Sequence, residues 1–253
     1  MKSIIVLPTY NERDNIDELL RRIFAAAPDI SVLIVDDSSP DGTGERVREL
    51  MRAYSHLRLI TRTAKDGLGK AYIHGFAAVL KEDFDTIMMM DGDLSHDPAM
   101  IPKLLAQRAR YDLVVGSRYI PGGTTEGWEL WRRLLSRWGN RYARAILRVP
   151  FRDCTTGYNA VCARLLRSLT LATINTAGYA FIMHLKYLLW KAGATVTEIP
   201  IRYQNRTAGK SKISNHIIAE GLLAPWKMLL KQVRTNHRRG TRMQDTVSDA
   251  RRA

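Results

Sequence analysis

Short apolar runs alternate with amphipathic helical patterns along the first half of the chain, and this alternation limits the fold more than any other feature. Helical patterns at residues 14–27, 41–54, 69–81 and 98–110 separate the runs. A strand–helix–strand rhythm predicts an α/β fold with a mostly parallel sheet flanked by helices. The predicted strands are KSIIVL, SVLIVD, LRLIT, DTIMMMD and DLVVGS.

Polar and turn residues crowd the points where these predicted strands end. Four such ends read LPTYNERDN, VDDSSPDGT, MDGDLSH and GSRYIPGG. In parallel sheets, ligands bind outside the carboxyl ends of the strands. The sequence therefore predicts that the functional residues gather at one edge of the sheet.

The fourth predicted strand runs directly into two carboxylates, Asp91 and Asp93. Two carboxylates this close repel unless a cation binds them, and Mg²⁺ is commonly held by one or two carboxylates together with substrate phosphates. Gly92 between them would allow backbone to approach a ligand closely. Taken alone, the motif also fits a strand end followed by a turn. His96 is expected to be a hydrogen-bonded loop residue rather than a ligand.

The ends of the first two strands offer side chains for a nucleoside. Asp37 could accept hydrogen bonds from a base or ribose, whereas helix capping explains part of the neighbouring run of Ser38, Ser39 and Asp41. In PTYNE, Tyr10 could serve as a platform for a base and Glu12 as a further acceptor, although a helix-entry turn also explains this motif.

Composition narrows the partners and the cellular setting. The 253 residues can form one main domain, and the formal net charge of +14 favours an anionic partner. A nucleic-acid-binding module lacks a recognition motif here, and a dinucleotide-dependent oxidoreductase lacks G-x-G-x-x-G after the first strand. Two cysteines are too few for a disulfide framework. Without a signal peptide or a membrane-spanning run, the chain is expected in the cytosol.

Five motifs together resemble family 2 glycosyltransferases, and more narrowly the polyprenol- or dolichol-phosphate mannose synthases. The motifs are PTYNE, VDDSSPDGT, DGDLSHDP, GSRYIPGG and a late KSK, and the resemblance covers roughly residues 3–225. It implies a GT-A (Rossmann-like) catalytic domain over 1–212, with a nucleotide-binding half (1–117) and an acceptor half (118–212). It also implies transfer of mannose from GDP-mannose to a polyprenyl (dolichyl) monophosphate with inversion. A UDP-glucose-dependent polyprenyl-phosphate glucosyltransferase stays open as the alternative.

The resemblance also assigns site residues by position. Catalytic roles fall to Asp91, Asp93 and Arg118, and Mg²⁺ or Mn²⁺ would sit on Asp91 and Asp93, with Ser95 as a third, weaker ligand. The acceptor phosphate would meet Arg118, Arg132, Arg133, Ser136 and Arg137. The nucleotide-sugar site would comprise Pro8, Tyr10, Glu12, Val35, Asp37, Asp91, Gly92, Asp93, Arg118, Arg206 and Lys212.

Amphipathic segments in the second half point to a membrane surface. On a helix from Trp128 to Arg148, the tryptophans share one arc and the arginines gather opposite, which suits an interface but also fits a helix that packs its Trp face on the core. An interfacial helical segment is predicted at 213–235, with a kink or restart at Pro225, before a basic, disordered tail at 236–253. The expected location is peripheral, on the cytoplasmic face of an anionic membrane, and a separate membrane-anchoring protein is a further candidate partner.

Overall fold

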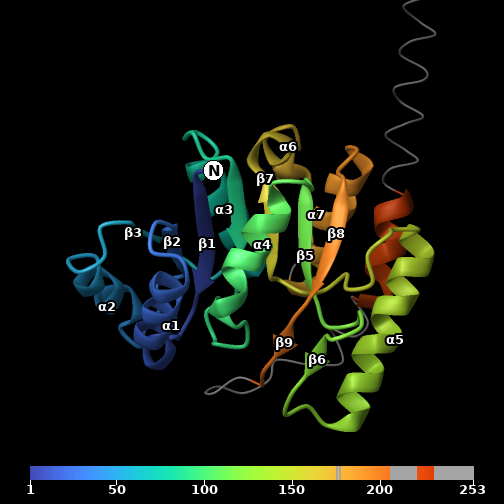
Figure 1. Ribbon diagram of the computed structural model, residues 1–253, viewed down its shortest axis with the longest axis horizontal. Helices are drawn as coiled ribbons and strands as arrows, with labels where there is room; N and C mark the ends of the chain where they lie inside the picture. The colour runs from blue at the N-terminus through green and yellow to red at the C-terminus, as the bar shows by residue number, and fades with distance from the viewer. Residues whose placement is uncertain (175, 177, 206–220, 231–253) are drawn as a thin grey trace, which may run out of the picture.

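A seven-stranded sheet forms the centre of the computed structural model, which describes residues 1–174, 176, 178–205 and 221–230 (Figure 1). Two further strands, β6 (Thr124–Thr125) and β9 (Arg202–Tyr203), form a small separate sheet. The strands of the large sheet are β1 (Ser3–Thr9), β2 (Ser31–Asp36), β3 (Leu57–Thr61), β4 (Thr86–Met89), β5 (Leu113–Ser117), β7 (Asn159–Cys162) and β8 (Val196–Pro200).

The strand order in this sheet is β3-β2-β1-β4-β7-β5-β8. All neighbouring pairs are parallel except those of β7, which runs antiparallel between β4 and β5. An antiparallel strand begins where its parallel neighbours end. The segment before β7 therefore reaches the same edge of the sheet as the loops that follow β4 and β5.

Helices cover both faces of the sheet (Figure 1). One face packs against α1, α2 and α4, and the other packs against α3, α6 and α7. The helices are α1 (Arg13–Ala26), α2 (Thr43–Leu50), α3 (Leu68–Val79), α4 (Ile101–Arg108), α5 (Leu130–Leu147), α6 (Ala163–Arg167) and α7 (Gly178–Lys191), with 3₁₀ turns η1 (Pro98–Met100) and η2 (Leu171–Thr173).

The continuous apolar strands follow from this two-sided burial. In β1, Ile4 and Val6 face the α3 and α7 side, whereas Ile5 and Leu7 face the α1 side. Because successive side chains of a strand point to opposite faces, a strand covered on both faces must be apolar at every position. The mostly parallel α/β sheet predicted from these runs is confirmed, whereas the antiparallel β7 was not predicted.

Helix α5 packs by a face that the sequence pattern did not single out. Its buried residues are Asn140, Ala143 and Leu147, while Trp131 and Trp138 are 57% and 54% exposed. The predicted helix began at Trp128, but α5 begins at Leu130, so Trp128 precedes it. Of the two interpretations of this helix, packing of the Trp face on the core is therefore wrong.

The described part of the C-terminal segment, residues 221–230, is helical throughout and packs Ala224 and Met228 into the cluster around α5 and α7. Of the predicted kink or restart at Pro225, the restart is wrong within this stretch, because the helical run passes through the proline, and the kink stays a prediction. Among the described residues, no helix is both long and apolar enough to cross a membrane.

Candidate active site

The polar strand ends predicted from the sequence meet at one edge of the sheet. The register pairs Thr9 with Asp36 across β1 and β2, and β4 lies on the other side of β1. The loops after β1, β2 and β4 are therefore neighbours, and the loop after β5 follows beyond β7.

The two acids after β2 play different parts. Asp36 is buried and accepts hydrogen bonds from Thr9 Oγ1 (2.8 Å) and from Ser39 N and Oγ, so it holds the two loops together. Asp37 instead pairs with the buried Arg62, with Nη1 2.6 Å from Oδ1. Burial raises the pKa of Asp37, and the Arg62 guanidinium opposes that rise. Arg62 was not predicted, because nothing local in LRLITRT marks it as a partner.

The residues after β1 surround the same edge. Lys65 Nζ lies 3.5 Å from the centroid of the Tyr10 ring, so a cation occupies the ring face that we predicted as a platform for a base. Glu12 accepts a hydrogen bond from Asn15 Nδ2 at 2.8 Å. Pro8 is half-buried, whereas the Val35 side chain is fully buried in the core and could meet a ligand only through its backbone.

The acidic pair Asp91 and Asp93 lies in a hydrogen-bonded loop after β4. The Asp91 backbone N–H donates to His96 Nδ1 at 3.1 Å, and His96 Nε2 lies 3.8 Å from Asp91 Oδ2. Burial lowers the pKa of His96 to about 4, so this imidazole is neutral at pH 7. His96 is fully buried and stacks on Tyr158, which confirms the prediction of a hydrogen-bonded loop histidine.

Ser95 supports Asp93 rather than standing beside it as an independent oxygen. Its backbone N–H and its hydroxyl both donate to Asp93 Oδ1, and Ser95 is fully buried. The hydroxyl of Ser95, the weakest of the predicted metal ligands, is therefore directed at the Asp93 carboxylate.

Two glycines fit closely around the acidic pair. A Cβ on Gly92 would lie 3.2 Å from Leu7 Cδ2, so the close approach that glycine allows here is to protein atoms. A Cβ on Gly157 would lie 2.9 Å from Asp91 Oδ1, which is closer than real Cβ contacts come. Gly157, just before β7, therefore leaves the space that the Asp91 carboxylate occupies, which its sequence context, TTGYN, did not reveal.

The donor set at this point suits a hard divalent cation. Asp91 and Asp93 lie one residue apart at a strand end, and no group of three or more His, Cys, Asp or Glu side chains that could hold a metal ion occurs in the described part of the chain. Two carboxylates completed by substrate phosphate oxygens are a common way to bind Mg²⁺. The residues present thus fit Mg²⁺ or Mn²⁺ bound together with a phosphorylated substrate.

Arg118, which follows β5, forms an ion pair with Asp153, 35 residues further along the chain. Its Nε and Nη2 each lie 2.8 Å from a different oxygen of Asp153, and its backbone N–H donates to the same carboxylate. Burial works against the charged form of Asp153, but the Arg118 guanidinium lowers the pKa of Asp153 to about 2. Both side chains are buried, and the attraction between them keeps both ionised at neutral pH despite that burial.

The predicted acceptor-phosphate residues divide into two groups. Arg118 and Arg132 stack on the same Trp128 ring, at 5.7 and 4.2 Å from its centroid, and Ser136 accepts a hydrogen bond from the Tyr119 hydroxyl at 2.6 Å. The structure therefore brings these three positions into one neighbourhood. By contrast, Arg133 and Arg137 are exposed on α5.

Sequence reasoning missed the buried polar turn that links these parts. Lys186 of α7 donates to the carbonyl oxygens of Asp153 (2.8 Å) and Thr156 (3.2 Å), and burial lowers its pKa to about 8. Asn140 of α5 accepts from the Cys154 N–H at 2.7 Å. The 153–156 turn is thus held from two helices, but these residues carry no local motif.

Some predicted residues lie outside the described part of the chain. These are Arg206 and Lys212, most of the 213–235 segment and the 236–253 tail. The division of the catalytic domain into halves at residues 117 and 118 also stays a prediction.

The comparison with protein families decides the classification. The model for glycosyl transferase family 2 matches residues 4–170. The chain belongs to this family.

Two bacterial relatives are similar over nearly the whole chain. A polyprenol monophosphomannose synthase from Mycolicibacterium smegmatis is 40% identical over 89% of this chain and 86% of its own length. An undecaprenyl-phosphate mannosyltransferase from Micrococcus luteus is 38% identical over 90% of this chain and 98% of its own.

Solved structures agree on the fold of this family 2 enzyme. A mannosyltransferase from Pyrobaculum calidifontis in complex with GDP-Man and Mn²⁺ superposes with a TM-score of 0.64 at 16% identity, covering 91% of this chain and 64% of that one. A glucosyl-3-phosphoglycerate synthase from Mycobacterium tuberculosis gives a TM-score of 0.62 at 19% identity, covering 88% and 79%. At these identities the likeness establishes the fold alone, and it agrees with the predicted GT-A architecture.

Proposed function

We propose that this glycosyltransferase moves mannose from GDP-mannose to a polyprenyl monophosphate, producing polyprenyl-phosphate mannose. The observation that carries the proposal is the identity of 38–40% to two enzymes named for this acceptor class, over 86–98% of their lengths. A match that spans both the acidic pair and the acceptor-side arginines supports the same substrates more strongly than a match to the nucleotide-binding residues alone.

The donor would lie along the ends of β1, β2 and β4. Asp37 and Glu12 offer carboxylate acceptors for base or ribose, and Tyr10 offers a ring on which a base could displace the Lys65 cation. Asp91 and Asp93 would hold the divalent cation, which when bound neutralises charge on the diphosphate leaving group. Gly157 and Ser95 would keep the two carboxylates in place for this task.

The acceptor phosphate would bind on the other side of β7, near Arg118, Arg132 and Ser136. Guanidinium groups match phosphate geometry and stay charged at all working pH values. A phosphate monoester is mostly dianionic at pH 7, so it can attack without a dedicated general base. Its oxygen forms a bond to the anomeric carbon while the bond from that carbon to the GDP oxygen breaks, with inversion. The protein orients the reactants and stabilises the departing charge.

A continuous apolar surface would bring the enzyme to its lipid acceptor. This apolar face joins α5 to the helix at 221–230, and Tyr142 connects them by accepting a hydrogen bond from Trp226 Nε1 at 2.8 Å while stacking on Trp138. The exposed residues of the apolar face are Leu130, Trp131, Leu134, Trp138, Leu223, Trp226 and Leu230. Exposed tryptophans on a helix that also carries exposed arginines suit a membrane interface that contains anionic lipid.

A donor-competition assay tests the proposed function. Purified enzyme receives a short-chain polyprenyl phosphate and either labelled GDP-mannose or labelled UDP-glucose, with Mg²⁺ or Mn²⁺. We expect transfer from GDP-mannose only, its loss in EDTA, and its restoration by excess metal. The Asp93→Ala variant should fail to transfer even with metal present. Preferential use of UDP-glucose, or full activity in EDTA, would overturn the proposal.

A further inference from the structure

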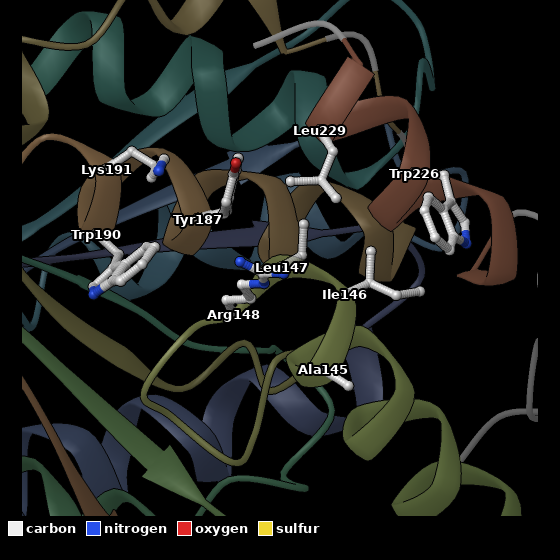
Figure 2. A pocket seen from close by; sticks show the side chains of 9 residues that line it. All are labelled: Ala145, Ile146, Leu147, Arg148, Tyr187, Trp190, Lys191, Trp226 and Leu229. Carbon is white, nitrogen blue, oxygen red and sulfur yellow. The ribbon is translucent and has the colours of Figure 1, made fainter. Parts of the chain in front are cut away.

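A groove of about 580 Å³ lies between the last turn of α5, the last turn of α7 and the helix at 221–230 (Figure 2). In this view Trp190 and Lys191 stand on one side and Trp226 and Leu229 on the other, with Arg148 between them. The volume is in the range of sites that bind small molecules. None of the acids at the strand ends and no residue of the 153–156 turn lines it, so the groove is separate from the candidate active site.

The groove combines apolar walls with positive charge. Trp190, Trp226 and Leu229 supply apolar surface, while Arg148 and Lys191 are both cationic. None of the nine described residues that line the groove is acidic. Two cations without a lining carboxylate favour an anion, and the neighbouring rings favour an apolar chain attached to that anion.

Arg148 occupies a position where an arginine is conformationally unfavourable. It caps the C-terminal end of α5 with φ of 52°, in the left-handed region that glycine adopts most easily. Glycine would therefore serve the turn at least as well as arginine. The arginine side chain, rather than the backbone, then accounts for the choice of residue, and that side chain lines the groove.

The groove also opens onto the apolar face defined above. Trp226 belongs to both, since it lines the groove and is 51% exposed. A ligand in the groove could therefore reach it from a bilayer against which the apolar face rests. This continuity favours a lipid over a soluble anion.

We propose that the groove binds one anionic phospholipid, with the phosphate between Arg148 and Lys191 and an acyl chain against Trp190, Trp226 and Leu229. The lipid is a structural ligand and not the acceptor, because the groove holds none of the residues assigned to the reaction. It would fix the orientation of α5 and the 221–230 helix on the membrane. This site goes beyond the proposed function and would persist if the donor or the acceptor proved to be different.

Short-chain lipids below their micelle concentration test the site without a membrane. The full-length protein is titrated by calorimetry with dihexanoyl phosphatidylglycerol and, separately, with dihexanoyl phosphatidylcholine. We expect saturable binding of one phosphatidylglycerol, with an affinity at least about tenfold higher than that for phosphatidylcholine. Both lipids carry the phosphate, but the choline cation of phosphatidylcholine cancels its net charge and is repelled by Arg148 and Lys191. Equal affinities for the two lipids would overturn the proposal.

Variants separate binding from folding. Arg148→Gly should bind phosphatidylglycerol about tenfold more weakly while its melting temperature stays equal or rises, because glycine relieves the left-handed backbone. Lys191→Gln should weaken binding similarly, and Arg141→Gln, an exposed arginine of α5 that does not line the groove, should change nothing. Mannose transfer to a water-soluble acceptor should be unaffected in all three. Unchanged lipid affinity in Arg148→Gly would refute the site.

Competition identifies the occupant. Inorganic phosphate at tenfold excess and geranyl phosphate at equal concentration should leave bound phosphatidylglycerol in place. Displacement by phosphate would show a simple anion site, and displacement by geranyl phosphate would reassign the groove to the acceptor. A dimer seen by sedimentation velocity that disappears in Arg148→Gly would make the groove an interface between copies of the chain. Each of these three results contradicts the proposal.

Discussion

Replacing one member of the buried Arg118–Asp153 ion pair should destabilise the protein. Replacing both members should recover much of that stability but none of the lost activity. Asp153→Asn alone leaves the Arg118 guanidinium buried without a counter-charge, and breaking a buried pair in this way costs about 3–5 kcal/mol. For a chain of this size, that loss corresponds to a fall in melting temperature of roughly 6–20 °C. Arg118→Met alone removes the guanidinium from the buried Asp153 carboxylate and leaves Lys186 as the nearby cation.

The double variant removes both charges and keeps the turn. The amide oxygen that Asp153→Asn introduces can still accept from the backbone N–H groups of Thr155 and Thr156, which now donate to Asp153 at 3.2 and 3.0 Å. Methionine fills the space of the arginine stem. Because an apolar replacement of a buried ion pair is often neutral, the double variant should recover more than half of the stability lost in Asp153→Asn.

Activity should behave differently from stability. If Arg118 contacts the reacting phosphates, its loss should reduce kcat about a hundredfold or more, and the double variant should be no better than Arg118→Met. The measurements are urea unfolding of the four proteins and mannose transfer at saturating donor. A double variant that regains activity together with stability would refute a direct role of Arg118. A cost of under about 1 kcal/mol for Asp153→Asn would refute the energetic reasoning.

Three further predictions address the metal site, pH and the membrane. Gly157→Ala should weaken Mn²⁺-dependent transfer about tenfold or more, because the new Cβ pushes aside the Asp91 carboxylate. A titration should show that transfer needs more Mn²⁺, while the circular dichroism spectrum stays unchanged. An unchanged titration would contradict the close contact. The unfolded chain protonates His96 below about pH 6.5, whereas the folded imidazole has a pKa of about 4, so stability should fall by up to about 3 kcal/mol as the pH drops through this window. Urea unfolding should show this slope, and His96→Gln should flatten it. Co-sedimentation with anionic liposomes should fall in high salt and fall further in the double variant Trp131→Ala/Trp138→Ala. It should not fall in Met51→Ala, which changes an exposed residue at the end of α2. Equal binding by the wild type and both variants would show that the apolar face does not contact the membrane.

Periodicity allowed the first five strands to be predicted, and with them the edge of the sheet at which the polar strand ends meet. The run IIVL in β1 and the runs VLIV in β2 and IMMM at β4 are apolar at every position, which is typical of strands buried on both faces, and acids follow the β2 and β4 runs directly in the chain. Each of these signals lies within one short stretch of the chain, so a single sequence is enough to detect it. The apolar arc of α5 was also visible, but amphipathicity alone does not say which face a helix buries.

Pairings between distant segments could not be predicted. Arg118 meets Asp153, and Gly157 meets Asp91, only because β7 inserts antiparallel between β4 and β5. The strand NAVC is four residues long and begins with a polar residue, so neither its length nor its pattern identifies it as a strand. Lys186 lies within a helix that is apolar on nearly all sides, and its two carbonyl acceptors become apparent only from the fold.

The central place of β7 also determines the breadth of the site. Asp91 follows β4 and Arg118 follows β5, with one strand between them, so two interstrand spacings of roughly 4.8 Å separate their strands by about 9.6 Å. Backbone hydrogen bonds maintain this distance, and exchanging side chains cannot narrow or widen it. The spacing between these strands does not depend on which hexose a donor carries. Selection among sugars must then depend on which hydroxyl groups the surrounding loops contact, so attempts to change the donor sugar should vary those loops and leave the strands untouched.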